Sequence, residues 1–445
     1  MKKRTQIMKK TIAILICAAS FHLMAGAQTS YTLDQCKQLA KENNHTLSTA
    51  YSHLKQSEEQ AKQAYTSFFP QVQAFGLGMQ SNKHLVEMDL DLPAEMAAML
   101  PPGITLPSSM GMMKKGVLGS ISAIQPVFTG GKITIGNKLA KFGVEANRIQ
   151  IESSEDEVEL TTEQYFWSVV SFKEKLRTLQ SLQAMLAQLE KDVSVAVKAG
   201  VTMRNDLLQV QLKENEVESG MLQVNNAISI YSQLLAQYIG ASGNIDVVSN
   251  INTESVPPLD LSIRRDHTAA LAATPQYRLL EKNVESHQLM HNMKKGENLP
   301  TVGVGAAYSY NDFMDKGRGV GTLFATVSVP ISGWWGATHA VRKQRLALDD
   351  AKSQLQDNSE KLIINMNNAW ANVETSHKQL QIARKSIEQS EENLRLNNDF
   401  YKAGTTKLSD LLDAQSSYQQ ARDKFVDAYI NYQTNLLKYR QATGQ

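Results

Sequence analysis

One eleven-residue segment occurs twice in this chain and constrains its architecture more than any other feature. KAGVTMRNDLL, at 198–208, returns 204 residues later as KAGTTKLSDLL, at 402–412. The same offset places Phe166 on Trp370, and nearer the start of the chain an offset of 230 places Pro70 on Pro300. The chain is therefore predicted to consist of two copies of one supersecondary unit, with extra residues in the first copy.

The repeats predict the domain boundaries. The first repeat covers 28–240 and the second covers 261–445, while 241–260 is interpreted as a linker because it is rich in Gly, Ser and Asn and contains paired prolines. Residues 1–27 carry five basic side chains, a short apolar run and a small-x-small site, which predicts an export signal. Removal of that signal changes the formal net charge from +2 to −3, so charge gives no indication of a nucleic-acid partner.

Beyond the predicted signal, Cys36 is the only cysteine, so no disulfide within the chain and no cysteine pair for a metal is expected. Its helical surroundings favour a buried side chain. No other stretch of the chain reaches the roughly 18 consecutive apolar residues that a spanning helix needs. If the exported chain enters a membrane, it is expected to do so by strands.

Each repeat has the same order of predicted elements: an interrupted helical segment, two strands, a very long helix without proline, and a further helix. At 1.5 Å per residue, the very long helix would measure about 100 Å. Apolar residues in the last two helices recur about every 3.5 positions, which predicts coiled-coil packing. The helical segments are 33–69 with a break at 43–45, 132–198 and 203–240 in the first repeat, and 261–297 with a break at 273–275, 337–402 and 408–443 in the second.

The repeated segment lies between the last two helices of each repeat and predicts a tight turn. Gly200 and Gly404 are expected to end the long helix in the left-handed conformation. Asn205 and Ser409 are expected to cap the helix that follows. The aspartates one position later favour the positive end of that helix.

Between the helices, apolar residues alternate with a period of two, which predicts strands with one apolar side and one small or polar side. On the apolar side, Phe75, Leu77 and Met79 lie together in the first strand, and Tyr308 and Tyr310 lie together in the third. The strands are expected at about 71–80, 117–127, 301–310 and 321–330.

A sheet made of two such hairpins cannot stand alone in lipid, because unpaired backbone groups at its edges cost several kcal/mol each. We therefore expect it to close by joining copies of itself, and eight, twelve or sixteen strands fit two, three or four chains. The small residues on the polar side favour a wide lumen. The predicted fold class is mainly α-helical, with a transmembrane β-barrel and two structural repeats per chain.

The paired repeats, the twin tip segments and the P-V-F-x-G-G element at 126–131 resemble the TolC family of outer-membrane efflux proteins. The resemblance runs from Tyr31 to Gly444. It implies a homotrimer in the outer membrane, embedded in outer-membrane lipid, whose twelve-stranded barrel continues into a periplasmic tunnel of α-helices. It also implies two partners, a periplasmic adaptor (membrane fusion) protein and an inner-membrane efflux transporter, and hence an exit duct for small molecules.

The same resemblance places the periplasmic entrance at the helical tips, where acidic side chains ring the narrowest point. The matching residues are Asp410 and Asp413, with Asp206 in the first repeat as a further gate residue. Three copies would form a negative collar that favours cations. The alternative is that Asp410 is only a partner of the helix dipole and Asp413 only a solvated acid.

The turns are the candidate docking site for the adaptor, because an exposed turn at the far end of a long helix is reachable from the inner membrane. Four aromatic residues near the strands are expected at the membrane interface, with burial between helices as the alternative for the tryptophans. The docking residues are Ala199, Gly200, Val201, Ala403, Gly404 and Thr405, and the interface aromatics are Trp334, Trp335, Tyr308 and Tyr310.

The first repeat is longer than the second because 26 extra residues lie between Pro70 and Pro126. They are expected to form an enlarged external loop within 81–116, rich in Met and Pro. No motif indicates an enzyme, a cofactor or a metal site: His287 and His291 lack an evident third ligand.

Two other functions fit the same pattern. One is the outer-membrane duct of a one-step protein secretion system, which would differ in its inner-membrane partner. The other is a soluble periplasmic coiled-coil scaffold, which would explain the heptad spacing but not the apolar side of the strands.

Overall fold

The computed structural model describes residues 29–89, 109–243, 245–249, 251, 254–312 and 317–445. The predicted export signal at 1–27 lies outside these residues, as does the part of the predicted external loop at 90–108. Within the described part, no helix combines the length and the apolar character needed to cross a membrane.

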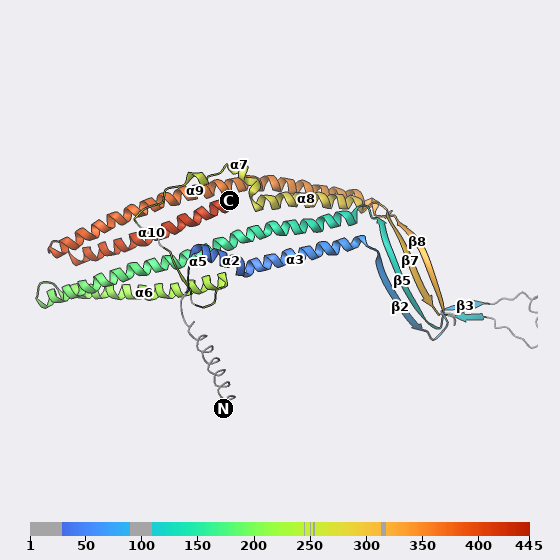
Figure 1. Cartoon of the computed structure of the whole chain (residues 1–445), viewed down its shortest axis with the longest axis horizontal. Helices are drawn as coiled ribbons and strands as arrows, with labels where there is room; N and C mark the ends of the chain where they lie inside the picture. Colours follow the sequence, from blue (N-terminus) through green and yellow to red (C-terminus); the bar gives the residue numbers. More distant parts are fainter. Residues whose placement is uncertain (1–28, 90–108, 244, 250, 252–253, 313–316) are drawn as a thin grey trace, which may run out of the picture. The chain divides into compact units, whose positions relative to one another are not determined.

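The chain divides into two compact units, and both repeats contribute to each unit (Figure 1). Unit 1 contains the described residues up to Ser52 together with Ile149–Arg278 and Asp357–Gln445. Unit 2 contains His53–Arg148 and Leu279–Gln356. Unit 1 is helical apart from one short strand pair, and unit 2 carries the sheet.

The interrupted helical segment of the first repeat is two helices, α2 (Leu33–Asn43) and α3 (His45–Tyr65), followed by a single turn, η1 (Thr66–Phe68). Asn44 makes the break. Its backbone is extended, its Oδ1 accepts the N–H of Thr46 at 2.8 Å, and its Nδ2 donates to the carbonyl oxygen of Tyr238 at 2.9 Å. The predicted break at 43–45 is confirmed.

The matching segment of the second repeat is less helical than predicted. Asp260 and Asp266 account for this, because their carboxylates accept the N–H groups of Ser262 and Thr268, each at 2.9 Å, and so begin separate short turns. The elements are η2 (Leu261–Ile263), α7 (His267–Ala270), η3 (Leu271–Ala273) and α8 (Pro275–Gly296).

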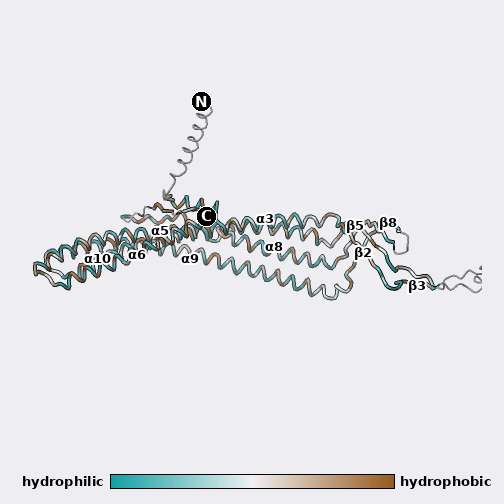
Figure 2. The backbone as a smooth tube through the Cα atoms, turned by 90° about the horizontal axis from the view of Figure 1, so that it is seen from below, coloured by the Kyte–Doolittle hydropathy of each residue, from teal (hydrophilic) through white to brown (hydrophobic). Residues whose placement is uncertain are grey.

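Four long helices follow the predicted pattern: α5 (Lys132–Lys198), α6 (Arg204–Ile239), α9 (Trp334–Lys402) and α10 (Leu408–Ala442). The sequence predicted both ends of α5, whereas α9 begins three residues before the expected start at Ala337. Figure 2 shows hydrophobic and hydrophilic segments interleaved along α5, α6 and α10.

The helix pairs of unit 1 pack as a coiled coil. Apolar residues of α5 at alternating spacings of three and four are buried against residues of α6 and α10, as the sequence predicted. The cluster contains Leu179, Leu182, Leu186, Leu189, Val193, Val210, Val217, Leu408 and Leu411.

A second cluster in unit 1 joins the two repeats. Phe166 and Trp370, which occupy matching positions of the repeats, are both almost completely buried in it. The Trp370 ring lies 5.0 Å from that of Tyr439, and the Phe166 ring lies 5.4 Å from that of Trp167. Matching positions of the two repeats thus belong to one shared core.

The sheet of unit 2 has four antiparallel strands in the order β2-β5-β7-β8. Each repeat supplies one hairpin, and the pairing of β5 with β7 joins the hairpins. Between β2 and β5 the chain adds a two-stranded ladder of β3 and β4. The strands are β2 (Gln71–Gln80), β3 (Val86–Asp89), β4 (Ser109–Met112), β5 (Lys115–Phe128), β7 (Thr301–Asn311) and β8 (Arg318–Ser328).

The register assigns each side chain of the sheet to one of two faces, since opposite residues in an antiparallel pair point to the same side. Tyr308 lies opposite Ile121 and Gly321, and Ile121 lies opposite Ala74. We call this side the apolar face, because its members are glycine, apolar or tyrosine except for Gln80, Lys115 and Gln125. The glycine, apolar and tyrosine members are Val72, Ala74, Gly76, Gly78, Val117, Gly119, Ile121, Ala123, Val302, Val304, Ala306, Tyr308, Tyr310, Gly319, Gly321, Leu323, Ala325 and Val327.

The opposite side, called the mixed face here, differs from the prediction in one strand. Phe75 lies opposite Ser120, and Ser120 lies opposite Ser309, so Phe75, Leu77 and Met79 point to the side on which β5 and β7 are polar. Alternation along one strand shows that its side chains point to two sides. Which of these sides matches the apolar side of the neighbouring strand depends on the register between the two strands, and the sequence of one strand does not give that register.

A strand pair also interrupts the predicted linker at 241–260. There β6 (Ile245–Val247) pairs in parallel with β1 (Thr29–Tyr31). Ile245 and Val247 are buried, and the ammonium of Lys173 on α5 donates to Asp246 Oδ1 at 2.6 Å. The sequence did not predict β6, because three residues are too few for a periodic signal.

Candidate functional site

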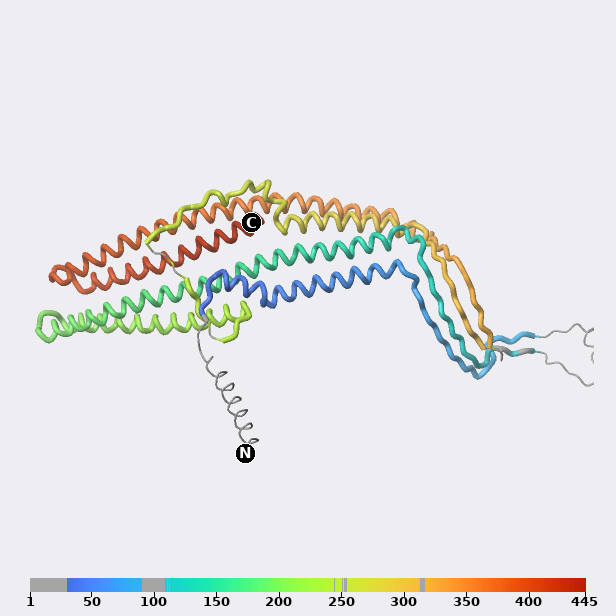
Figure 3. Tube along the Cα trace, in the orientation of Figure 1, coloured from blue at the N-terminus to red at the C-terminus, as the bar shows by residue number. Residues whose placement is uncertain are grey.

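Two matching turns connect the long helices at one end of unit 1 (Figure 3). In the first, Gly200 has φ +73°, and the N–H of Val201 donates to the carbonyl of Ala196 at 2.9 Å. In the second, Gly404 has φ +72°, and the N–H of Thr405 donates to the carbonyl of Phe400 at 2.9 Å. Both predicted left-handed glycines are confirmed, and both turns have the Schellman hydrogen-bond pattern.

Neither Asn205 nor Ser409 caps the helix that follows its turn. α6 and α10 begin two residues earlier than a cap at those positions would require, which places Asp206 and Asp410 third in their helices. Asp206 accepts the hydroxyl hydrogen of Thr202. Asp410 accepts the hydroxyl hydrogen of Thr406 at 2.8 Å and the N–H of Lys407 at 3.4 Å. The predicted capping by Asn205 and Ser409 was wrong.

These bonds determine the charge of the second tip. The hydroxyl of Thr406, followed by the backbone N–H of Lys407, holds the pKa of the exposed Asp410 below its usual range. Asp413 lies three residues further along α10 and is also exposed. The second tip therefore presents two neighbouring carboxylates to solvent, and Asp206 belongs to the first tip.

Tyr401 at the end of α9 was not singled out from the sequence. Burial raises the pKa of its phenol, and the charges of Asp206 and Asp192 raise it further. Tyr401 also packs against the leucine cluster of the coiled coil. Tyr401 of the second repeat is thus close enough to Asp206 of the first repeat to feel its charge. The sequence gives no signal for this role, because one tyrosine at an apolar position of a helix is not distinctive.

The residues predicted to dock a partner are all accessible. Ala199, Gly200, Ala403, Gly404 and Thr405 are exposed, and Val201 is 80% exposed. A Cβ atom added to Gly200 or Gly404 would meet nothing within 4 Å. Glycine is therefore favoured at the tips by the positive φ alone, and not by crowding.

The tyrosines predicted for the membrane interface lie on the apolar face near the end of β7. Tyr308 is 60% exposed and Tyr310 is 45% exposed. A Cβ atom on Gly319 of β8 would collide with the hydroxyl of Tyr308, and one on Gly317, just before β8, would collide with that of Tyr310. These two glycines thus leave room for the tyrosine rings.

The tryptophans lie at the other end of the strands, where α9 begins. Trp334 Nε1 donates to the carbonyl oxygen of Asn298 at 3.0 Å. Trp335 is 82% exposed. Within unit 2, tyrosines and tryptophans therefore mark opposite ends of the sheet.

Among the described residues, no group of three or more His, Cys, Asp or Glu side chains gathers in a way that could hold a metal ion. Cys36 is fully buried, and burial raises the pKa of its thiol to about 12, so it is not a thiolate at neutral pH.

Comparison with known proteins agrees with this architecture. The chain matches the family model described as "outer membrane efflux protein" over residues 37–241 and 268–445. A comparison with curated protein sequences gives no match.

Solved structures with the same fold include outer membrane channels. CmeC of Campylobacter jejuni is 15% identical, with a TM-score of 0.77 over 93% of this chain and 85% of that one. VceC of Vibrio cholerae is 12% identical, with a TM-score of 0.72 over 93% and 96%. The open state of MtrE from Neisseria gonorrhoeae is 16% identical, with a TM-score of 0.72 over 93% and 88%. At these identities the likeness establishes the fold alone.

Proposed function

The chain belongs to the outer membrane efflux protein family, and from this premise we propose that three copies form the exit duct of a tripartite system that expels small molecules. Membership places the chain in the outer membrane as an efflux channel. We propose in addition that the chain forms a trimer with a closed barrel, that it works with two partner proteins, and that its cargo is small molecules.

The observation that carries the proposal is the apolar face together with the open edges of its sheet. β2 and β8 are edge strands with no further partner among the described residues. Their free N–H and C=O groups would be unpaired in lipid, at a cost of several kcal/mol per group. Pairing β2 of one copy with β8 of the next removes both edges, and three copies give a closed barrel of about twelve strands.

The apolar face then contacts lipid and the mixed face lines the lumen. The aromatic residues support this orientation. Tyr308 and Tyr310 would lie at one membrane interface, and Trp334 and Trp335 would lie at the other, as aromatic girdles do in outer-membrane barrels.

The helical tips would form the periplasmic entrance. Asp410 and Asp413 of three copies would give a negative collar with Asp206 close by, and the low pKa of Asp410 keeps it charged at neutral pH. The exposed turns at 199–201 and 403–405 would bind a periplasmic adaptor protein that connects the duct to an inner-membrane efflux transporter.

Reconstitution tests this function. The purified full-length chain should form a trimer in detergent by native mass spectrometry and should give discrete conductance steps in a planar lipid bilayer. A mutant cell lacking the chain should accumulate a small-molecule cargo that the wild-type cell expels. A monomer that gives no conductance would contradict the proposal.

A further inference from the structure

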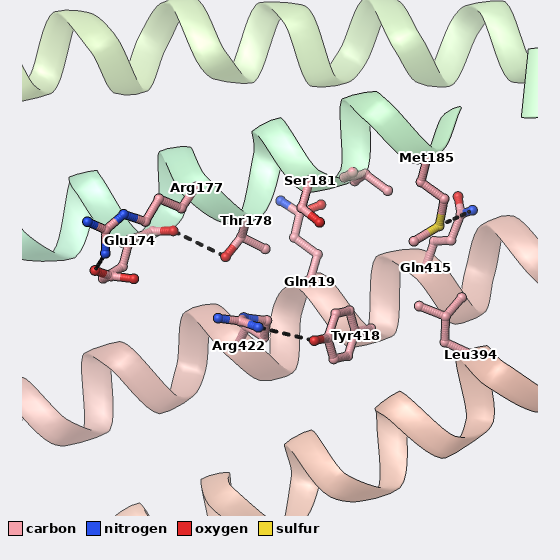
Figure 4. Close-up of a pocket in the computed structure, with 11 residues that line it drawn as sticks. Glu174, Arg177, Thr178, Ser181, Met185, Leu394, Gln415, Tyr418, Gln419 and Arg422 are labelled. Atoms are coloured by element: carbon pink, nitrogen blue, oxygen red, sulfur yellow. Dashed lines mark hydrogen bonds and ion pairs between the residues drawn. The ribbon is translucent and has the colours of Figure 1, made fainter. Parts of the chain in front are cut away.

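A cavity of about 120 Å³ lies within unit 1, where α5 of the first repeat faces α9 and α10 of the second (Figure 4). It contains none of the tip residues and none of the strand residues. The cavity is therefore separate from the collar, the docking turns and the sheet.

One end of the cavity is charged. Glu174 and Arg177 on α5 form an ion pair, which neutralises both groups. Arg422 on α10 donates to the phenol oxygen of Tyr418 at 3.1 Å, and its guanidinium lies 5.9 Å from the Tyr418 ring. Its charge also acts on the neighbouring carboxyl of Asp423, but among the described residues no carboxylate forms an ion pair with it. That end therefore presents a guanidinium that a carboxylate could pair with directly.

The other end is apolar. Figure 4 shows Met185 and Leu394 there, with the Tyr418 ring between that end and Arg422. A thioether, an aliphatic side chain and an aromatic face make a surface that accepts a compact ring. An engineered cavity of about 150 Å³ holds a benzene molecule, so a cavity of about 120 Å³ is comparable in size to one ring.

A buried acceptor without a partner adjoins the same end. Gln415 is 2% exposed, its Nε2 lies 2.9 Å from the Met185 sulfur, and its Oε1 is buried with no hydrogen-bond partner. A thioether sulfur is a weak acceptor, so the protein atoms around this amide satisfy it poorly. A hydroxyl group on a bound molecule could donate to Oε1.

We propose that this cavity binds a small aromatic carboxylate that carries a hydroxyl group. The carboxylate would pair with Arg422, the ring would pack on Tyr418, Met185 and Leu394, and the hydroxyl would donate to Gln415. Gln415 and Arg422 are seven residues apart on α10, about two helical turns, so one ring bearing a polar group at each end spans the distance that their side chains leave.

Such a ligand would bridge the two repeats of one chain. Asp427 on α10 already contacts α5, since it lies 3.0 Å from the Lys175 ammonium and accepts from the Ser171 hydroxyl at 3.2 Å. A molecule in the cavity would add a further connection, nearer the tips than that of Asp427. Its effect on opening of the entrance rests on the proposed function, whereas its binding does not.

Equilibrium dialysis of the full-length purified protein tests the site with three probes. 4-Hydroxybenzoate should bind at one site per chain. 4-Hydroxybenzamide lacks the charge and 4-methoxybenzoate lacks the donor, so each should bind at least about tenfold more weakly. Equal binding of all three probes, or no binding of 4-hydroxybenzoate, would overturn the proposal.

Variants locate the site. Arg422→Gln should weaken binding of 4-hydroxybenzoate at least about tenfold, whereas Arg422→Lys, which keeps the charge, should weaken it less. Ser181→Leu fills the cavity from α5 and should abolish binding while the thermal unfolding curve is retained. Unchanged binding in both Arg422→Gln and Ser181→Leu would contradict the assignment. Bilayer conductance measured on the same samples separates the two claims, because loss of conductance with retained binding contradicts only the proposed function.

Discussion

Gly130 and Gly296 face each other in unit 2 so closely that a Cβ atom added to either residue would collide with the carbonyl oxygen of the other. Gly130 follows β5 with φ +64°, and Gly296 is the last residue of α8. The contact joins the junction between β5 and α5 of the first repeat to the end of α8 of the second. No side chain fits between these two backbones.

Gly296→Ala should therefore destabilise the protein by about 1–3 kcal/mol, the usual cost of forcing an extra group into a packed site. Gly136→Ala on α5 is the matched control, because a Cβ atom there would meet nothing within 4 Å. That change should stabilise the helix by about 0.5–1 kcal/mol. Chemical unfolding of both variants in the same detergent measures the difference, and equal stabilities would show that the contact is relaxed in solution.

The charge of the second tip predicts ion selectivity. Replacing both Asp410 and Asp413 with Asn should lower the cation-to-anion permeability ratio, because the collar would lose its fixed negative charge. Asp357→Asn, which removes an acid from the surface of α9 where it pairs with Lys361, is the control and should leave the ratio unchanged. Reversal potentials in a salt gradient across a planar bilayer measure the ratio, and the collar is excluded if the double variant behaves like the control.

The same collar should resist mild acid. A carboxyl group whose folded-state pKa is depressed stays ionised until the pH falls through that lowered value. The pKa of Asp410 is held below its ordinary 3.8 by the Thr406 hydroxyl and then the Lys407 N–H, so cation preference should persist from about pH 7 to about pH 5. Thr406→Val removes the hydroxyl and should move the loss of preference to higher pH.

The exposed tip predicts a docking phenotype. Gly404→Phe should prevent co-purification of the adaptor while the trimer remains, because the Phe ring would project into solvent where nothing lies within 4 Å of the Cβ position. The left-handed backbone costs such a residue only about 1–2 kcal/mol. Gly404→Asn is the control, since Asn tolerates this conformation and is small. Adaptor recovered equally with both variants would argue against docking at this turn.

Asp156 on α5 predicts a dependence of stability on pH. Burial raises its pKa to about 6, and the charges of Glu159, Glu155 and Glu152 contribute further. The folded state therefore holds this proton more tightly than the unfolded state, and the group costs stability as the pH rises from about 4 to about 6. Because the side chain is partly exposed, solvent screening limits the cost to about 1 kcal/mol.

Asp156→Asn should accordingly stabilise the protein at pH 7–8 by up to about 1 kcal/mol and should have no effect near pH 4. Glu157→Gln removes a neighbouring exposed acid and serves as the control. The free energy of unfolding of each variant, measured at pH 4 and at pH 7–8, tests this prediction. If Asp156→Asn stabilises the protein equally at both pH values, the raised pKa of Asp156 is not the cause.

The sequence predicted the long helices well because their limits have local causes. Proline is absent from 132–198, and the glycine at 200 can adopt the left-handed turn without strain, so α5 ends where its own residues require. The coiled-coil spacing of Leu179 to Val193 is likewise a property of one helix. Features of this kind need no knowledge of the rest of the fold.

The errors arose where two segments must be compared. Phe75 and its neighbours alternate correctly within β2, but their side of the sheet depends on the pairing of Phe75 with Ser120. Asn205 has the right chemistry for a cap, but the helix begins at Arg204 and the aspartate after Asn205 reaches back instead. β6 exists because β1, more than 200 residues earlier in the chain, supplies its hydrogen bonds. Strand register and long-range pairing depend on two segments of the chain, so neither can be predicted from one segment alone.

The most direct test of the account is a cross-link between the two open edges of the sheet. In a Cys36→Ala background, Gln73→Cys on β2 would be combined in turn with Val320→Cys, Thr322→Cys or Phe324→Cys on β8, all four on the mixed face. We predict that one combination gives a covalent trimer on a non-reducing gel after oxidation of native membranes, while Gln73→Cys alone does not. A chain that stays monomeric in every combination and disperses in water without detergent would contradict the closed barrel.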